Sequence, residues 1–204
     1  DNIVLLELID QKELEEAVVI KLGRRSLLVT WHPVTLEPGR TRADFQVLLD
    51  ALQETEGLRI LFTKANADTE GRVINQMIDK YVATHPDNTV SHTSLGQLRY
   101  LSAMKYVDGV VGNSSSGIIE APSFQTATVN IGDRQRGRVR ASSVIDCDPN
   151  VTSITNSLLQ LFDDEFQSSL KNVINPHGAG NVAGNIVRVL RRHSLTDIVK
   201  KSFY

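Results

Sequence analysis

Short apolar segments alternate with amphipathic helical patterns along most of this chain, and this alternation restricts the possible folds more than any other feature. Consecutive strands joined by helical crossovers run parallel, and a parallel sheet needs helices on both faces. The sequence therefore predicts an α/β domain, a Rossmann-like three-layer α/β/α arrangement with a parallel sheet. The expected strands cover residues 26–31, 58–63, 89–92, 107–111, 127–131 and 144–146, and the expected helices cover residues 11–21, 44–54, 69–82, 95–104, 115–124, 150–162 and 179–192.

The composition fits a globular domain and excludes several classes of protein. With 204 residues, 41% hydrophobic residues and a net charge of −2, the chain can bury a sizeable core, but it lacks the basic surface of a nucleic-acid-binding protein. It contains no run of about 18 apolar residues, so no membrane partner is expected and the cytoplasm is the predicted location. Cys147 is the only cysteine, which excludes a disulfide framework and a multi-cysteine metal site. We expect neither a metal ion nor a cofactor.

Polar residues follow the first five of the expected strands at their carboxyl ends. In open parallel sheets, ligands bind in the crevice outside these ends. Because several loops contribute to the same edge, their convergence is a stronger indication of a site than any single motif. The residues concerned are His32, Asn66 with Asp68, Thr93 with Ser94, 113–116, and Asp133 with Arg134.

Residues 112–117 (GNSSSG) connect the expected strand 107–111 to the expected helix 115–124. A strand that ends in small hydroxyl residues and opens a helix presents backbone N–H groups and a positive helix end to a phosphate. Glu120, one to two turns into that helix, can accept hydrogen bonds from both ribose hydroxyls of a nucleotide. The alternative is an ordinary helix cap, with Glu120 only complementing the helix dipole. The run of serines exceeds what a cap requires and favours a diphosphate site.

Four segments of the chain resemble one enzyme family. Residues 29–35 (VTWHPVT), 66–68 (NAD), 112–120 (GNSSSGIIE) and 130–137 (NIGDRQRG) are similar to the second half of UDP-N-acetylglucosamine 2-epimerases. The resemblance is strongest to the hydrolysing branch, which makes N-acetylmannosamine for sialic acid synthesis. It implies a GT-B (UDP-glycosyltransferase/glycogen phosphorylase-like) enzyme, in which two Rossmann-like halves hold the UDP-sugar between them. Residues 1–204 would be the carboxyl-terminal, UDP-binding domain.

The resemblance also implies roles for individual residues. Ser114 and Ser115 match the diphosphate ligands, Glu120 matches the ribose ligand, and Thr93 matches the position whose backbone meets the uracil. The remaining matches to the UDP site are His32, Asn66 and Arg134.

His32 is in addition the catalytic candidate, because an imidazole that titrates near neutral pH can donate to a phosphate or protonate a leaving group. The alternative for His32 is a turn cap before Pro33, and the alternative for Arg134 is plain surface charge. The nearby arginines at 136, 138 and 140 are predicted to form a solvated face rather than an anion site.

The implied reaction eliminates UDP across C1 and C2 of the sugar and then adds water to release N-acetylmannosamine. The carboxylates that take the C2 proton lie in the amino-terminal domain of these enzymes, and this chain, which begins with Asp1, is expected to start after it. We therefore expect the isolated chain to bind weakly and to catalyse nothing. The expected partners are UDP-N-acetylglucosamine or UDP, the chain's own amino-terminal domain, and further copies in a homo-oligomer.

Three alternatives stay open at this point. The chain could belong to a non-hydrolysing 2-epimerase, although the GNSGG motif of that branch differs from GNSSSG. It could instead be the nucleotide-binding half of a GT-B glycosyltransferase, which shares the fold and the ribose-binding glutamate. A non-catalytic nucleotide-binding module would use the same loop to sense a ligand. Fold alone does not choose among these classes.

Overall fold

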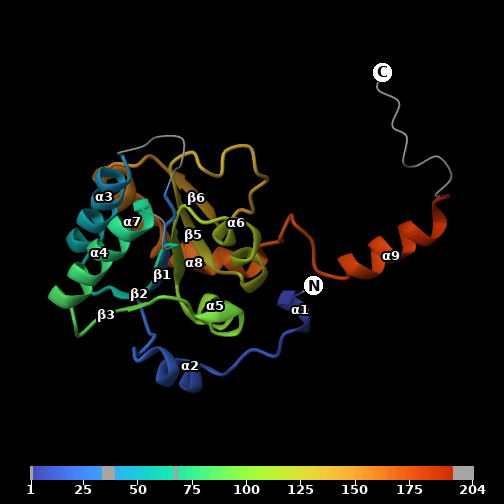
Figure 1. Cartoon of the computed structure of the whole chain (residues 1–204), viewed down its shortest axis with the longest axis horizontal. Helices are drawn as coiled ribbons and strands as arrows, with labels where there is room; N and C mark the ends of the chain where they lie inside the picture. The colour runs from blue at the N-terminus through green and yellow to red at the C-terminus, as the bar shows by residue number, and fades with distance from the viewer. Residues whose placement is uncertain (1, 34–39, 67–68, 195–204) are drawn as a thin grey trace.

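The computed structural model describes residues 2–33, 40–66 and 69–194, and contains the strands and helices that the alternation predicts (Figure 1). The strands are β1 (Ser26–Thr30), β2 (Arg59–Thr63), β3 (Thr89–His92), β4 (Gly109–Gly112), β5 (Ala127–Ile131) and β6 (Val144–Cys147). The α-helices are α1 (Asn2–Leu5), α2 (Gln11–Val18), α3 (Thr41–Glu54), α4 (Thr69–Thr84), α5 (Gly96–Tyr106), α6 (Ser116–Ile119), α7 (Val151–Leu161), α8 (Asp164–Ser169) and α9 (Val182–Arg192). Two 3₁₀ helices complete the set, η1 (Ala121–Phe124) and η2 (Leu170–Asn172).

The strands of the described residues form one six-stranded sheet in the order β3-β2-β1-β4-β5-β6, and every neighbouring pair is parallel. This confirms the predicted parallel sheet. The chain builds outward from β1 to β3, then returns to the middle and continues from β4 to β6. The strand order therefore reverses between β1 and β4, and the crevice beyond their carboxyl ends is where such sheets bind ligands.

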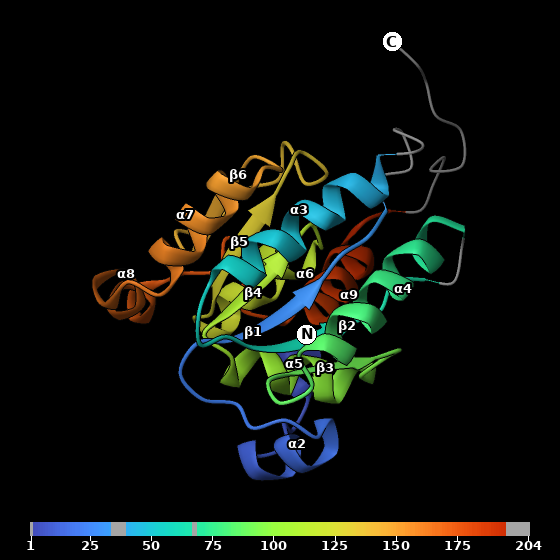
Figure 2. The ribbon, with the colours of Figure 1, turned by 90° about the vertical axis from the view of Figure 1, so that its left-hand side faces the viewer.

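Helices cover both faces of the sheet, which gives the three layers that the sequence predicts (Figures 1 and 2). Helices α3, α4 and α7 pack on one face, where Phe45, Ile74 and Ile154 belong to one core cluster. Helices α2 and α5 cover the other face, where Leu14 and Leu101 belong to a second cluster. Because β1 contributes to both clusters, it is buried along its whole length, as expected for a central parallel strand.

Gly112 lets the last residue of β4 approach β1 closely. It pairs with Thr30 across the two strands and has φ +138°, a backbone conformation that side chains with a Cβ rarely adopt. A Cβ at this position would lie 2.0 Å from the Thr30 carbonyl oxygen. Glycine is therefore required at the point where the strand order reverses.

The expected helix 115–124 is wrong as a single element. The α-helix ends at Ile119, and a separate 3₁₀ turn, η1, begins at Ala121. Pro122 explains the break, because it has no backbone N–H to donate to the carbonyl four residues earlier. Glu120 lies at this junction rather than inside a continuous helix. The large helix dipole that was expected to favour a phosphate is correspondingly reduced, since α6 is only one turn long.

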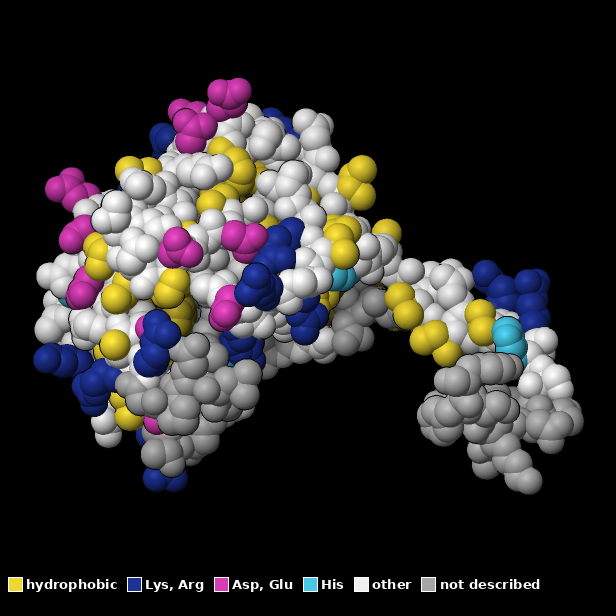
Figure 3. Space-filling model, turned by 90° about the horizontal axis from the view of Figure 1, so that it is seen from above, with side chains coloured by type: hydrophobic (Ala, Val, Ile, Leu, Met, Phe, Trp, Pro, Cys, Tyr) yellow, Lys and Arg dark blue, Asp and Glu magenta, His cyan; other side chains and the backbone are white. Residues whose placement is uncertain are grey.

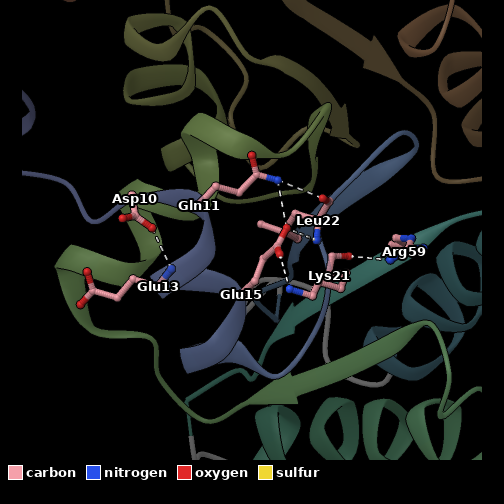
Figure 4. Close-up of polar contacts among 7 residues, drawn as sticks. All are labelled: Asp10, Gln11, Glu13, Glu15, Lys21, Leu22 and Arg59. Carbon is pink, nitrogen blue, oxygen red and sulfur yellow. Dashed lines mark hydrogen bonds and ion pairs between the residues drawn. The ribbon is translucent and has the colours of Figure 1, made fainter.

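A cluster of polar contacts holds α2 and the segment that leads into β1 (Figure 4). The Glu15 carboxylate accepts from Lys21 Nζ, Gln11 Nε2 and the Leu22 N–H, each at 2.9 Å. Asp10 caps the helix by accepting from the Glu13 N–H. These contacts fix the turn after α2, which was expected to be helical up to residue 21 but ends at Val18.

Helix α9 extends from the body of the domain with one apolar side and one basic side (Figures 1 and 3). No residue of α9 is buried. Its exposed apolar residues are Val182, Ile186, Val187, Val189 and Leu190. Among the helices of the described residues, none is long and apolar enough to cross a membrane.

Candidate nucleotide site

Asn113 joins the carboxyl ends of β1 and β4 at the point where the strand order reverses. Its side-chain oxygen accepts from the backbone N–H of His32, and its side-chain nitrogen donates to the backbone carbonyl of His32, both at 2.8 Å. The side chain is only 1% exposed, so these two bonds form away from water. The amide thus fixes where the histidine and the serine loop, residues 114–116, lie relative to each other.

The loop after β5 is attached to the same residue. Arg134 Nη1 and Gln135 Nε2 both donate to the Asn113 backbone carbonyl, at 3.1 and 2.9 Å. A guanidinium group therefore lies beside the serine loop, with other N–H groups left to bind an anion. Three strand ends, those of β1, β4 and β5, meet around Asn113.

The serine loop turns tightly into α6. The Ser115 carbonyl accepts from the N–H groups of Ile118 and Ile119, and Ser114 Oγ accepts from both the N–H (3.4 Å) and the hydroxyl (3.0 Å) of Ser116. Within the part of the chain that the structure describes, the N–H groups of Ser114 and Ser115 have no protein acceptor. Together with the half-buried hydroxyls, these N–H groups can donate to a phosphate.

A chain of hydroxyl groups runs from the sheet to this loop. Thr63 and Thr30, paired at the ends of β2 and β1, have their Oγ1 atoms 2.7 Å apart. Thr30 Oγ1 lies 3.1 Å from the hydroxyl of Tyr100 on α5, which in turn lies 2.6 Å from Ser116 Oγ. Ser116 then contacts Ser114, so side chains from three strands or helices support the loop.

Burial favours the uncharged forms of two titratable side chains of the site, His32 and Glu120. Burial lowers the pKa of His32, and the charge of Arg134 lowers it further, which favours the neutral imidazole in the ligand-free chain. Burial raises the pKa of the Glu120 carboxyl. An incoming diphosphate would favour the protonated imidazole, and ribose hydroxyls would favour the ionised carboxylate.

The predicted site residues divide into two groups. His32 and Arg134 contact Asn113, and Ser114 and Ser115 continue the same loop, so the structure brings these residues together. Glu120 is close enough to Tyr100 to affect its titration. The remaining predicted residues, Asn66 and Thr93, are exposed beyond β2 and β3, and among the described residues no hydrogen bond joins them to the serine loop. Predicted residues 34, 35 and 68 lie outside the described part of the chain.

Three residues that sequence reasoning did not select as site residues support the site. The sequence indicates Asn113 only as part of the serine motif, and it gives no separate indication of Tyr100 or Gln135. Asn113 could have been recognised from the sequence, because an asparagine at the end of a central strand is expected to be buried and a buried amide needs hydrogen-bond partners. Tyr100 could not, because only the packing of α5 reveals its contacts.

A cavity of about 560 Å³ lies next to this site, beyond the ends of β5 and β6. Asn113 and Arg134 line it, whereas the serines and Glu120 do not. Arg136 and Arg140 also line it. Arg136 and Arg138 are exposed, as the prediction of a solvated face requires. The prediction is wrong for Arg140, which is half-buried and forms an ion pair with Asp146 at 2.6 Å. Lys and Arg side chains gather near the middle of the face that Figure 3 shows.

Comparison with known proteins identifies the family. The sequence profile of the family described as UDP-N-acetylglucosamine 2-epimerase matches residues 1–191. The chain belongs to this family. Its relatives include GDP/UDP-N,N'-diacetylbacillosamine 2-epimerase (hydrolyzing) of Campylobacter jejuni, 36% identical over 97% of this chain and 51% of the relative. Polysialic acid biosynthesis protein P7 of Escherichia coli is 33% identical over 94% of this chain and 48% of the relative.

Solved structures agree on the fold. UDP-GlcNAc 2-epimerase from Neisseria meningitidis bound to UDP-GlcNAc matches with a TM-score of 0.73 and 19% identity, over 89% of this chain and 49% of that chain. A sucrose-phosphate synthase from Thermosynechococcus elongatus matches with a TM-score of 0.53 over 94% and 51%. This chain thus has a Rossmann-like α/β fold that matches about half of each of these GT-B-like enzymes. The chain spans about half the length of the curated relatives that match most of it.

Proposed function

We propose that this chain is the UDP-binding half of a hydrolysing UDP-N-acetylglucosamine 2-epimerase, which converts UDP-N-acetylglucosamine and water to N-acetylmannosamine and UDP. The observation that carries the proposal is the junction at Asn113. There the His32 backbone and the Arg134 guanidinium group bond to Asn113, and Arg134 is near enough to the imidazole to lower its pKa. The adjacent N–H groups of Ser114 and Ser115 have no protein acceptor among the described residues. Several hydrogen-bond donors directed at one place suit a diphosphate.

The reaction has two steps, and this half of the enzyme would serve the first. A base removes the C2 proton, the C1–O bond breaks, and its electron pair leaves on the diphosphate. Donors already in place around the diphosphate stabilise that charge more in the transition state than in the substrate. Water then adds to the resulting glycal, with its hydroxyl on C1 and a proton on C2. The base belongs to the amino-terminal half, which we propose as the partner of this chain.

The parts of the nucleotide are assigned to the residues that the family resemblance matches. The diphosphate would accept from the loop at Ser114 and Ser115, with Arg134 as a cation and His32 as a hydrogen-bond or proton donor. Glu120 would accept from the ribose hydroxyls. The uracil and sugar contacts would come from the exposed residues beyond β3 and β2, Thr93 and Asn66.

The relatives suggest a second candidate substrate. The relative from Campylobacter jejuni has a name that specifies a diacetylated bacillosamine sugar on GDP or UDP, and it matches nearly the whole chain. A hydrolysing enzyme for UDP-N,N'-diacetylbacillosamine would use the same diphosphate site. The two candidates differ in the sugar, which the proposed amino-terminal half would contact, and a product assay with both substrates separates them.

UDP binding by the chain itself tests the proposal. UDP is titrated into ¹⁵N-labelled protein, with ADP as the matched control that keeps the diphosphate and changes the base. We expect the largest amide shifts at residues 113–117 and at His32, and weaker binding of ADP. Absence of shifts at this loop would contradict the site. For the division into halves, the chain alone should release no N-acetylmannosamine from UDP-N-acetylglucosamine, and measurable turnover would contradict it.

A further inference from the structure

The hydroxyl chain that ends at Ser114 has a defined direction. Each hydroxyl has one hydrogen to donate, whereas its oxygen can accept twice. Ser116 donates its hydrogen to Ser114, so the short 2.6 Å contact between Ser116 and Tyr100 needs the hydrogen of Tyr100. Tyr100 then has none left for Thr30, which must donate to it at 3.1 Å. By the same argument Thr63 donates to Thr30 at 2.7 Å rather than to the Val29 carbonyl, which is farther away at 3.4 Å.

This direction determines what Ser114 offers to a ligand. Its oxygen accepts from both the N–H and the hydroxyl of Ser116, so its own hydrogen cannot point at that neighbour. In the ligand-free chain the Tyr100 oxygen is near enough to accept this hydrogen, and a bound phosphate would compete for it. A hydroxyl that already accepts hydrogen bonds is a better donor to that phosphate because such chains polarise their members.

We infer that Tyr100 is a positioning residue for the nucleotide diphosphate: by donating to Ser116, it holds Ser114 as an acceptor toward the protein and a donor toward the phosphate. This inference rests on the proposed function and deepens it. Tyr100 does not contact the ligand in this arrangement. Its ring lies largely buried on α5, and its hydroxyl connects the ends of β1 and β2 to the phosphate loop.

The first test compares ligands with and without phosphate. In the chain as it stands, Tyr100→Phe removes only the hydroxyl that completes the connection. We expect about a 3- to 10-fold weaker affinity for UDP, the range for one neutral hydrogen bond, and unchanged affinity for uridine. The matched control is Tyr106→Phe, which removes a phenol hydroxyl from the same helix, where it donates to the Ile9 carbonyl. The control should bind both ligands like the original chain.

A double-mutant cycle separates positioning from general damage to the loop. When Ser114→Ala has already removed the terminal hydroxyl, adding Tyr100→Phe should cause no further loss of UDP affinity. A further loss of the same size in the Ser114→Ala background would overturn the inference, because Tyr100 would then act through other groups. Equal losses for UDP and uridine would overturn it as well.

A measurement without ligand tests the direction independently of the proposed function. The Tyr100 hydroxyl proton is expected to show a nuclear Overhauser effect to the β protons of Ser116 rather than to Thr30. The opposite contact would overturn the inference even if UDP binds. If the direction is as inferred but the original chain does not bind UDP, the proposed function fails, and the role of Tyr100 toward a diphosphate fails with it.

Discussion

Replacing Asn113 with Ala tests whether this one side chain holds the ends of β1 and β4 together. The side chain is 1% exposed and makes two 2.8 Å hydrogen bonds to the peptide groups of His32. A neutral hydrogen bond contributes about 0.5–1.5 kcal/mol, and a buried polar group left unpaired costs about 1–3 kcal/mol. Because both His32 groups lose their partner, we expect the free energy of unfolding to fall by about 2–4 kcal/mol.

Urea unfolding measures this loss as a lower midpoint at an unchanged slope, since the surface exposed on unfolding stays the same. Two asparagines provide controls. Asn75 makes the same pair of bonds to the N–H and carbonyl of Ala65, at 2.9 and 3.1 Å, but is half-buried, so Asn75→Ala should cost less. Asn88 makes one bond, to the Leu58 carbonyl at 2.9 Å, and Asn88→Ala should cost about 1 kcal/mol.

The test is the order of the losses in unfolding free energy among these three variants. If Asn113→Ala costs no more than Asn88→Ala, the two bonds to His32 do not support the fold, and the explanation of the junction fails. Ligand binding adds a second criterion. Asn113→Ala should weaken UDP binding, whereas Asn88, at the opposite edge of the sheet, should not affect it. Equal UDP affinity of the Asn113 variant would refute the link between the junction and the site.

Two further substitutions and one chemical probe test other parts of the structure. Gly112→Ala should unfold at a much lower urea concentration than Gly96→Ala. Both glycines have a positive φ, but only at position 112 would a Cβ clash with a backbone oxygen. Similar urea midpoints for the two variants would contradict the close approach of β4 to β1. Burial raises the pKa of the Glu120 carboxyl, so its ionisation at pH 7 lowers the free energy of unfolding. Glu120→Gln should therefore be more stable than the original chain at pH 7, and this difference should vanish as the pH falls below about 4.5. The same variant should bind UDP more weakly, and unchanged affinity would remove Glu120 from the ribose site. Burial raises the pKa of Cys147 to about 11, so its reaction with a disulfide reagent should be slow at pH 8 and accelerate towards that pH; fast reaction at pH 8 would contradict its burial.

The sequence predicted the sheet well because each strand has a local signal. The strands at residues 89–92 and 127–131 have the expected bounds, and the first strand differs by one residue. The order of the strands in the sheet has no such local signal, because it depends on the sheet face against which each connecting helix packs. The reversal between β1 and β4, and the need for Gly112, follow only from that order.

The helices show where local signals mislead. The break between α6 and η1 was readable in the sequence, because Pro122 stands within the expected helix. Helix α8 was not predicted. Asp163 caps it by accepting from the Phe166 N–H, but the helix has only six residues, too few to distinguish it from a loop in the sequence. Arg140 was predicted to be solvated, but tertiary packing brings Asp146 to it from β6.

The candidate site was predicted as a set of loops but not as a network. His32, Ser114 and Arg134 could be selected because polar residues after parallel strands gather at one edge. Their connection through Asn113 could not, because it joins residues 81 positions apart. Tyr100 is similar, since its two partners, Thr30 and Ser116, come from different strand ends.

The two ends of the proposed nucleotide site differ in how far they are formed before a ligand binds. On the diphosphate side, Asn113 and Tyr100 anchor the loop to the end of β1 through buried or half-buried hydrogen bonds. Further bonds connect it to Thr63 of β2 and to Arg134 after β5. On the uracil and sugar side, Thr93 and Asn66 are exposed, and among the described residues no hydrogen bond joins them to that network. Groups already held in place lose little freedom on binding, whereas exposed side chains must be ordered. For this reason the phosphates, rather than the base, should provide most of the affinity of this half of the enzyme for UDP.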